Sequence, residues 1–136
     1  MLIKPRILFI LIYLSCHYLL IAKDYYVHPK LGKDSNTGLS KKQAFKTLEQ
    51  ASKIYYIPGD RLLLASSETY MNSIKLINQE GTLENPIIIT TVLWKLKDTI
   101  VPAKIDFKGK ANGILIEDSS FIEIINIQLV ANGSYE

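Results

Sequence analysis

GILIEDSSFIEIINI, residues 113–127, carries the pattern that decides the fold. Two short runs rich in isoleucine, 114–116 and 121–127, flank the polar pair Asp118-Ser119. Short runs of β-branched residues bounded by turn formers are typical of strands. Polar residues such as Glu123 and Asn126 should alternate outward, because successive side chains of a strand point to opposite faces.

Earlier runs of the same kind show that this pattern extends through most of the chain. They lie at 62–65, 74–77, 87–92 and 105–107, and no helical periodicity appears after Pro58. Many short strands fit an antiparallel sandwich or barrel, or a parallel β-helix. The scarcity of two-residue hairpin signals favours the β-helix. With three strands per coil, the first coil contains the strands that start at 62, 74 and 87, and the second contains those that start at 105, 114 and 122. Stacking of these coils should bury an inner column of Ile and Leu.

The polar segment 32–40 raises the question of a ligand loop. It is rich in Gly, Asp, Ser and Asn, which favour turns. A calcium loop counted from Asp34 accepts Asn36 at its third position, but Gly38 stands where a ligand belongs and Phe45 occupies position twelve. Phosphate-loop and dinucleotide fingerprints are absent from the sequence. The segment is therefore interpreted as a turn, with a weak calcium site at Asp34 and Asn36 as the alternative.

A helix is expected to follow this turn. Phe45, Leu48 and Ala51 recur at helical spacing, which predicts an amphipathic helix over 44–55. Ser40 and Gln43 have the spacing of a capping box at its start. Since the open end of a solenoid exposes unpaired backbone, this helix is expected to cap it.

The N-terminus resembles a secretory signal peptide. Lys4 and Arg6 precede an apolar run at 7–14, which residues 18–22 extend. Cleavage before Cys16 with lipidation is an alternative, and a membrane span is disfavoured by the polar interruption at 15–17. The protein is therefore expected to be secreted, at the cell surface or periplasmic, without a stable membrane span after cleavage.

The expected domain boundaries follow from this reading. Residues 1–22 form the signal peptide, and 23–136 form the N-terminal portion of a β-helix domain, with its cap at 25–60 and its coils at 61–136.

The inventory of charged and metal-binding residues excludes several functions. From Lys23 onward there are 14 Lys and Arg against 13 Asp and Glu, so no basic surface for nucleic acid is expected. The only Cys is Cys16, and beyond the export segment the only His is His28. Neither a thiolate metal site nor a histidine cluster can be built from these. His28 is expected to be an ordinary surface or edge-strand residue.

These features together resemble the N-terminal signature of secreted right-handed parallel β-helix proteins of the pectate-lyase-like superfamily. The resemblance covers roughly 25–133 and departs at Thr37-Gly38-Leu39, where members often have Pro and then Gly-Thr. The matching residues are Tyr26-Val27, Gly32, Asp34-Ser35-Asn36, Gly38, Phe45-Lys46-Thr47-Leu48, Ala51, Pro58-Gly59-Asp60, Tyr70, Gly81-Thr82, Glu84-Asn85-Pro86-Ile87, Ile89, Gly113-Ile114 and Ser120-Phe121-Ile122-Glu123-Ile124.

The resemblance implies an exported carbohydrate-active protein. Many members degrade acidic polysaccharides. In the lyases, calcium held by carboxylates neutralises a uronic acid, and a Lys or Arg abstracts the adjacent proton. Other members are glycoside hydrolases with paired carboxylates, or bind glycans without catalysis. The resemblance assigns only structural roles here, to Gly38, Phe45, Gly59, Asp60, Asn85 and Pro86.

Catalytic and metal-binding residues stay unknown at this stage. Paired carboxylates can bind calcium or act as acid and base, but charges on strand edges more often keep a sheet soluble. A role in keeping the sheet soluble is therefore the preferred interpretation for these charged residues: Asp106, Glu117, Asp118, Glu123, Lys104, Lys108 and Lys110.

The C-terminal sequence suggests that catalytic coils are missing from this chain. Residues 132–136 fall where a turn to another coil is expected, and repeat folds usually need at least ~3 repeats. The Asn132-Gly133-Ser134 sequon is read as a turn. The first hypothesis is a polysaccharide lyase acting on acidic glycans by metal-assisted β-elimination, with calcium in the full-length protein. The alternative is a non-catalytic extracellular β-helix protein that binds glycans.

Overall fold

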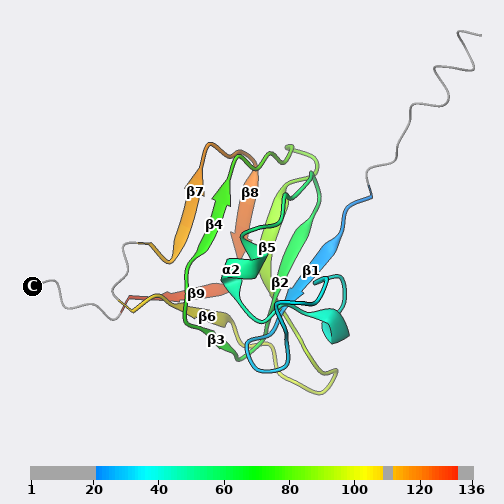
Figure 1. Ribbon diagram of the computed structural model, residues 1–136, viewed down its shortest axis with the longest axis vertical. Helices are drawn as coiled ribbons and strands as arrows, with labels where there is room; N and C mark the ends of the chain where they lie inside the picture. Colours follow the sequence, from blue (N-terminus) through cyan, green and yellow to red (C-terminus); the bar gives the residue numbers. More distant parts are fainter. Residues whose placement is uncertain (1–20, 109–111, 132–136) are drawn as a thin grey trace, which may run out of the picture.

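The computed structural model describes residues 21–108 and 112–131 and consists mainly of short strands (Figure 1). The expected signal peptide, apart from Ile21 and Ala22, lies outside the described residues, as do Lys110 and the sequon at 132–134. Within the described ranges, no helix has the length and apolar character needed to cross a bilayer.

The strands form three sheets in which every pairing between named strands is parallel. Sheet A has the order β1-β2-β5-β8, with β1 at Asp24–Val27, β2 at Arg61–Ala65, β5 at Ile87–Val92 and β8 at Ile122–Ile125. Sheet B has the order β3-β6-β9, with β3 at Thr69–Tyr70, β6 at Ala103–Asp106 and β9 at Ile127–Val130. Sheet C pairs β4, at Ile74–Ile77, with β7, at Ile114–Glu117.

From β2 onward the chain visits the sheets in the fixed rotation A, B, C. Parallel neighbours need a crossover connection, and here the other two sheets provide it. This arrangement is that of an all-β, parallel β-helix-like fold, and it excludes the antiparallel sandwich for the described strands. The right-handed winding and the number of coils stay predictions.

The expected grouping of strands into coils needs correction. The strand at 87–92 was expected in the same coil as that at 62–65, but β5 pairs directly with β2 in sheet A. The two-residue strand β3, which was not expected from the sequence, supplies the sheet B strand between β2 and β4. The expected strand at 121–127 is in fact divided at Asn126, whose positive φ of 56° turns the chain from β8 into β9.

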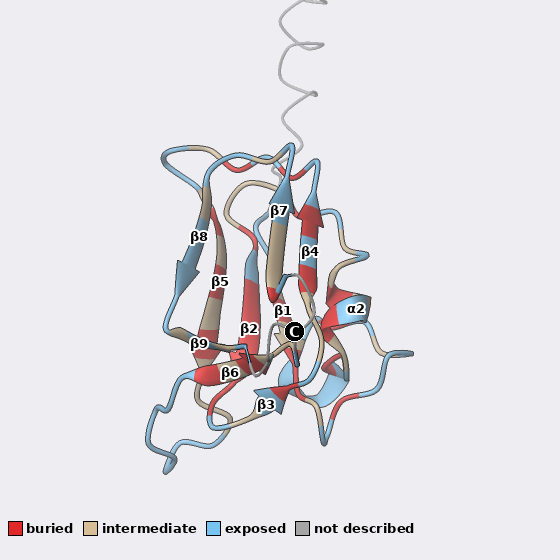
Figure 2. Ribbon diagram, turned by 90° about the vertical axis from the view of Figure 1, so that its left-hand side faces the viewer, coloured by how far each residue is buried: buried red, intermediate tan, exposed pale blue. Residues whose placement is uncertain are grey.

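The predicted inner column of Ile and Leu is confirmed. The buried residues come from strands in all three sheets, as the red bands in Figure 2 show. They alternate along β4, β5 and β6, whereas residues 62–65 of β2 are all buried. Burying each such side chain contributes about 1.5–3 kcal/mol relative to exposure. The most buried members are Leu62, Leu64, Ile74, Leu76, Ile87, Ile89 and Ile105.

The expected helix over 44–55 is wrong in length. The structure has a 3-10 turn, η1 (Lys41–Gln43), and a single α-helical turn, α2 (Leu48–Ala51). Between them Phe45 is extended, because its N–H donates to the Tyr26 carbonyl and its carbonyl accepts from the His28 N–H. Backbone groups that pair with β1 cannot also continue a helix. The capping role is nevertheless retained, since Phe45, Leu48 and Ala51 are buried.

The polar segment 32–40 is a structural turn, as the sequence predicted. Asp34 Oδ1 accepts hydrogen bonds from the N–H groups of Lys46 and Thr47, both at 2.9 Å. Asn36 Nδ2 donates to the Ala44 carbonyl at 2.8 Å. Gly38 has a φ of +77°, and a Cβ there would lie 2.4 Å from the Phe45 ring. Asp34 and Asn36 thus hold the turn together through their side chains.

Asp60 joins the cap to sheet A. Its side chain is buried, and Oδ1 accepts from the Lys23 N–H at 2.7 Å while Oδ2 accepts from the Ile57 N–H at 3.0 Å. The preceding Gly59 has a φ of +88°, and its N–H donates to the Asn85 carbonyl. The structural roles expected for these residues are therefore consistent with their contacts. Pro86 lies immediately before β5.

Replacing Asp60 with alanine should lower the free energy of unfolding by about 3 kcal/mol, because two backbone N–H groups lose a charged acceptor. Urea denaturation of the Asp60→Ala variant measures this. Glu123→Ala is the control, since Glu123 is an exposed carboxylate on β8, and surface changes usually stay within about 0.5 kcal/mol. Equal losses in the two variants would contradict the role given to Asp60.

Candidate functional site

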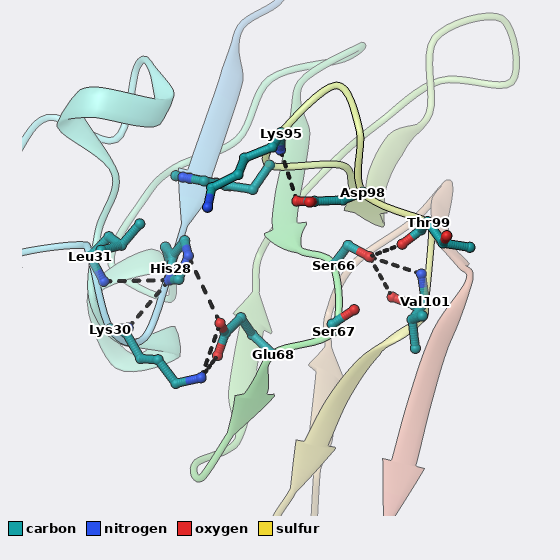
Figure 3. A pocket seen from close by; sticks show the side chains of 11 residues that line it. His28, Lys30, Leu31, Ser66, Ser67, Glu68, Lys95, Asp98, Thr99 and Val101 are labelled. Carbon is teal, nitrogen blue, oxygen red and sulfur yellow. Dashed lines mark hydrogen bonds and ion pairs between the residues drawn. The ribbon is translucent and has the colours of Figure 1, made fainter.

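A cavity of about 480 Å³ lies where the chain leaves three neighbouring strands of sheet A (Figure 3). Its walls come from the segments after β1, after β2 and after β5. Since these strands are parallel and adjacent, their carboxyl ends meet at one edge of the sheet. Segments far apart in sequence therefore converge on one site.

The loop at 93–102, between β5 and β6, forms one wall. Trp94 reaches back to β1, where its ring meets His28 edge-on with 4.6 Å between centroids, and Tyr26 at 6.3 Å. Lys41 fixes the same loop, because Nζ donates to the Leu93 carbonyl at 2.7 Å and lies 5.8 Å from the centre of the Trp94 ring. The single Trp of the chain is thus held in place while remaining half-buried.

Ser66 anchors the other end of the loop. Its Oγ accepts from the Val101 N–H at 2.8 Å and lies within hydrogen-bonding distance of the carbonyls of Thr99 and Val101. Within the loop, Asp98 Oδ2 accepts from the Lys95 N–H at 3.1 Å. The Asp98 carboxylate is therefore placed on the wall of the cavity (Figure 3).

His28 forms part of the base of the cavity. Its Nδ1 accepts from the backbone N–H groups of Lys30 and Leu31, at 3.3 and 3.4 Å. An accepting Nδ1 leaves the proton on Nε2, which lies 4.0 Å from Glu68 Oε1. Burial lowers the pKa of His28; the charge of Glu68 opposes this shift and that of Lys30 adds to it. The expected surface position is therefore wrong, because His28 is buried. The other expected position, at an edge strand, agrees with the structure, since His28 directly follows β1 at the edge of sheet A.

Glu68 is the shielded carboxylate of the site. Lys30 Nζ lies 2.8 Å from Oε2 and donates to Oε1 at 3.2 Å. The Glu68 side chain is largely shielded from solvent, whereas that of Lys30 is exposed. A carboxylate held in this way is an acceptor for hydrogen bonds from a ligand that enters the cavity.

The carboxylates singled out in the sequence do not gather in this cavity. Asp106 ends β6 in sheet B, Glu117 ends β7 in sheet C with Asp118 next to it, and Glu123 lies on β8 in sheet A. Across residues 21–108 and 112–131, no group of three or more His, Cys, Asp or Glu is placed to hold a metal ion. Lys104 lies on β6, and Lys108 donates its N–H to Asp106 Oδ1.

Comparison with known proteins finds similarity in structure only. No protein-family model and no curated protein matches the chain. Two solved structures of a GH136 lacto-N-biosidase from Eubacterium ramulus, the native protein and its selenomethionine derivative, superpose with a TM-score of 0.70 at 22% and 21% identity. The matches cover 83% and 90% of this chain, but only 21% and 22% of the enzyme. The likeness shows the fold.

Sequence reasoning missed Glu68, Trp94 and Asp98. One usable signal was the interval between the strands at 87–92 and 105–107, which is the longest in the strand region and contains the only Trp. Glu68 gave no such signal, because its role depends on the short strand β3 that follows it. Membership of the pectate-lyase-like superfamily is not confirmed by these comparisons.

The lowered pKa of His28 predicts a measurable effect of pH on stability. Below pH 6.5 an unfolded histidine takes up a proton that the folded His28 resists. The free energy of unfolding should therefore fall as the pH drops from about 6.5 towards the folded-state pKa. In His28→Asn the side-chain oxygen can still accept from the two N–H groups, but this pH dependence should disappear.

Urea denaturation of both proteins between pH 7.5 and 5.0 tests this. The carboxylates are common to both, so the difference between the two pH profiles isolates His28. Superimposable profiles would contradict the buried, neutral state described for this residue.

Proposed function

We propose that this chain is the N-terminal portion of an exported, carbohydrate-active β-helix protein, and that the cavity beside Trp94 binds a saccharide. The observation that carries the proposal is that an aromatic ring, Trp94, and two carboxylates, Glu68 and Asp98, line one open cavity. The structural likeness to a lacto-N-biosidase supports the carbohydrate class.

The chemistry of sugars matches these groups. A saccharide presents apolar C–H faces together with hydroxyl donors, so it needs a flat apolar surface and nearby acceptors. Trp94 supplies the flat apolar surface and keeps its orientation through His28 and Lys41. Glu68 and Asp98 supply the hydrogen-bond acceptors. A few fixed polar groups in a partly apolar cavity are typical of ligand sites.

The geometry supports binding better than catalysis by this segment. Glycoside hydrolysis generally needs one carboxylic acid to protonate the leaving oxygen and a second carboxylate on the other side of the bond. Glu68 is ion-paired with Lys30, which suits an acceptor rather than a proton donor. We therefore place the chemistry of the whole protein outside the described residues, which leaves this site as a binding subsite.

A polysaccharide lyase acting on acidic glycans with calcium is the second candidate, and it rests on the sequence resemblance. Its calcium would require a group of carboxylates, and the described residues gather none. Under this candidate the metal ligands and the Lys or Arg base come from other coils. A saccharide-binding subsite is compatible with both candidates, and with the non-catalytic alternative.

Trp94→Ala should weaken saccharide binding at least tenfold, about 1.4 kcal/mol, because the apolar surface for the sugar ring is lost. Isothermal titration calorimetry with lacto-N-biose, the disaccharide for which the neighbouring enzyme is named, and with trigalacturonate covers the neutral and acidic classes. Tyr55→Ala is the matched control, since Tyr55 is an exposed aromatic residue that does not line the cavity. Binding of neither sugar by the wild type, or equal loss in both variants, would contradict the proposal.

A further inference from the structure

Asp60 is a buried carboxylate that has no cationic partner in the described part of the chain. Its exposure is 1%, and its two oxygens accept hydrogen bonds from the backbone N–H groups of Lys23 and Ile57. None of the ion pairs among the described residues includes it. Arg61, its neighbour in sequence, is paired with Asp24 instead. Burial of a carboxylate is costly unless a positive charge compensates it.

One of the two donors lies where the leader is expected to end. The Lys23 nitrogen is 2.7 Å from Asp60 Oδ1, which is the shorter of the two contacts. The Lys23 carbonyl accepts from the Arg61 N–H at 2.9 Å, and β1 begins at the next residue. Ala22, on the other side of this nitrogen, is exposed. The position of the nitrogen is therefore set by the residues that follow it.

Cleavage of the leader would change the charge at this position. Ala22 suits the last position of a signal peptide. Hydrolysis of the Ala22–Lys23 bond by a signal peptidase consumes one water, leaves a carboxylate on Ala22 and frees the amine of Lys23, which takes up a proton at neutral pH. We propose that the resulting α-ammonium group forms an ion pair with buried Asp60, so that removal of the leader completes the fold. This inference rests on the export of the chain, which is part of the proposed function.

The exchange of an amide for an ammonium group strengthens a contact that already exists. Hydrogen bonds between charged groups are roughly twice as strong as those between neutral ones. Asp60 is buried in both forms, so its own desolvation does not differ between them. The ammonium group keeps water on the side that Ala22 leaves, because Ala22 is exposed. The cost of desolvating the new charge is therefore partial, and the net effect on the folded state is stabilising.

The ion pair would link maturation of the chain to its stability. It joins the residue before β1 to the residue before β2, two strands that are neighbours in sheet A. The unprocessed chain has a neutral amide at Lys23 and lacks this link. A chain that is exported in unfolded form thus gains the additional stability after the leader has been removed.

Two chains that differ only in their first residue test the ion pair. One starts at Lys23 and the other at Ala22, and each is released from a removable fusion partner. Both carry one α-ammonium group, but only in the first does this group reach Asp60. Urea denaturation at about pH 6.5, where the amine is protonated, should give an unfolding constant about tenfold lower for the chain that starts at Lys23. Equal unfolding constants overturn the proposal.

Removing the charge of Asp60 provides the second test. Asp60→Asn keeps an oxygen that can accept from Lys23 but has no charge, so the difference between the two chains should shrink to less than about twofold. Glu123→Gln is the matched control, because Glu123 is an exposed carboxylate on β8, and it should leave the difference intact. A difference that persists in Asp60→Asn overturns the proposal. The two wild-type chains need no substitution, so their comparison is decisive even if Asp60→Asn fails to fold.

Mass spectrometry of the exported protein separates this inference from export itself. The full chain is produced in a bacterial secretion host, and the product outside the cytoplasm should begin at Lys23. An exported product that begins at another residue, Cys16 included, overturns the inference and leaves export standing. Retention of the uncleaved chain in the cytoplasm contradicts export, and the inference with it.

Discussion

The structure depends on in-register stacking of parallel strands. Each circuit must return the chain to the same sheet with the same face inward, because a shift of one residue would turn an inner isoleucine outward. The corners maintain this register. Asn78 and Asp118, both at positive φ, follow the paired strands β4 and β7, and the Asn78 N–H donates to the Glu117 carbonyl. The core and the convergence of segments at the cavity follow from this repetition.

The fold was predictable where one residue pattern decided it. The strands at 74–77 and 87–92 have the expected bounds, since a short run rich in β-branched residues between turn formers is a local signal. Errors arose where tertiary contacts outweighed local preference. Phe45 has helical spacing to Leu48, yet it is extended because the edge of β1 takes its backbone hydrogen bonds. The coil grouping failed because β3 is too short to show any periodicity.

The candidate site was much less predictable. Its carboxylate, histidine and tryptophan are widely spaced in sequence, and only the adjacency of β1, β2 and β5 brings them together. The carboxylates that sequence reasoning selected lie on separate sheets instead. The fold alone does not assign a function. The proposed saccharide subsite therefore rests on Trp94, Glu68 and Asp98 themselves, and on the physical fit between these groups and a sugar ring.

Trp94 is the only tryptophan in the chain, so its indole N–H gives a single, unambiguous NMR signal. The most direct test of the saccharide site is to follow this signal in a ¹⁵N-labelled sample during titration with lacto-N-biose and, separately, with trigalacturonate. A saturable shift of the Trp94 indole resonance, together with backbone shifts confined to the segments after β1, β2 and β5, is the predicted result. An unchanged indole signal at saturating concentrations of both sugars would contradict the account.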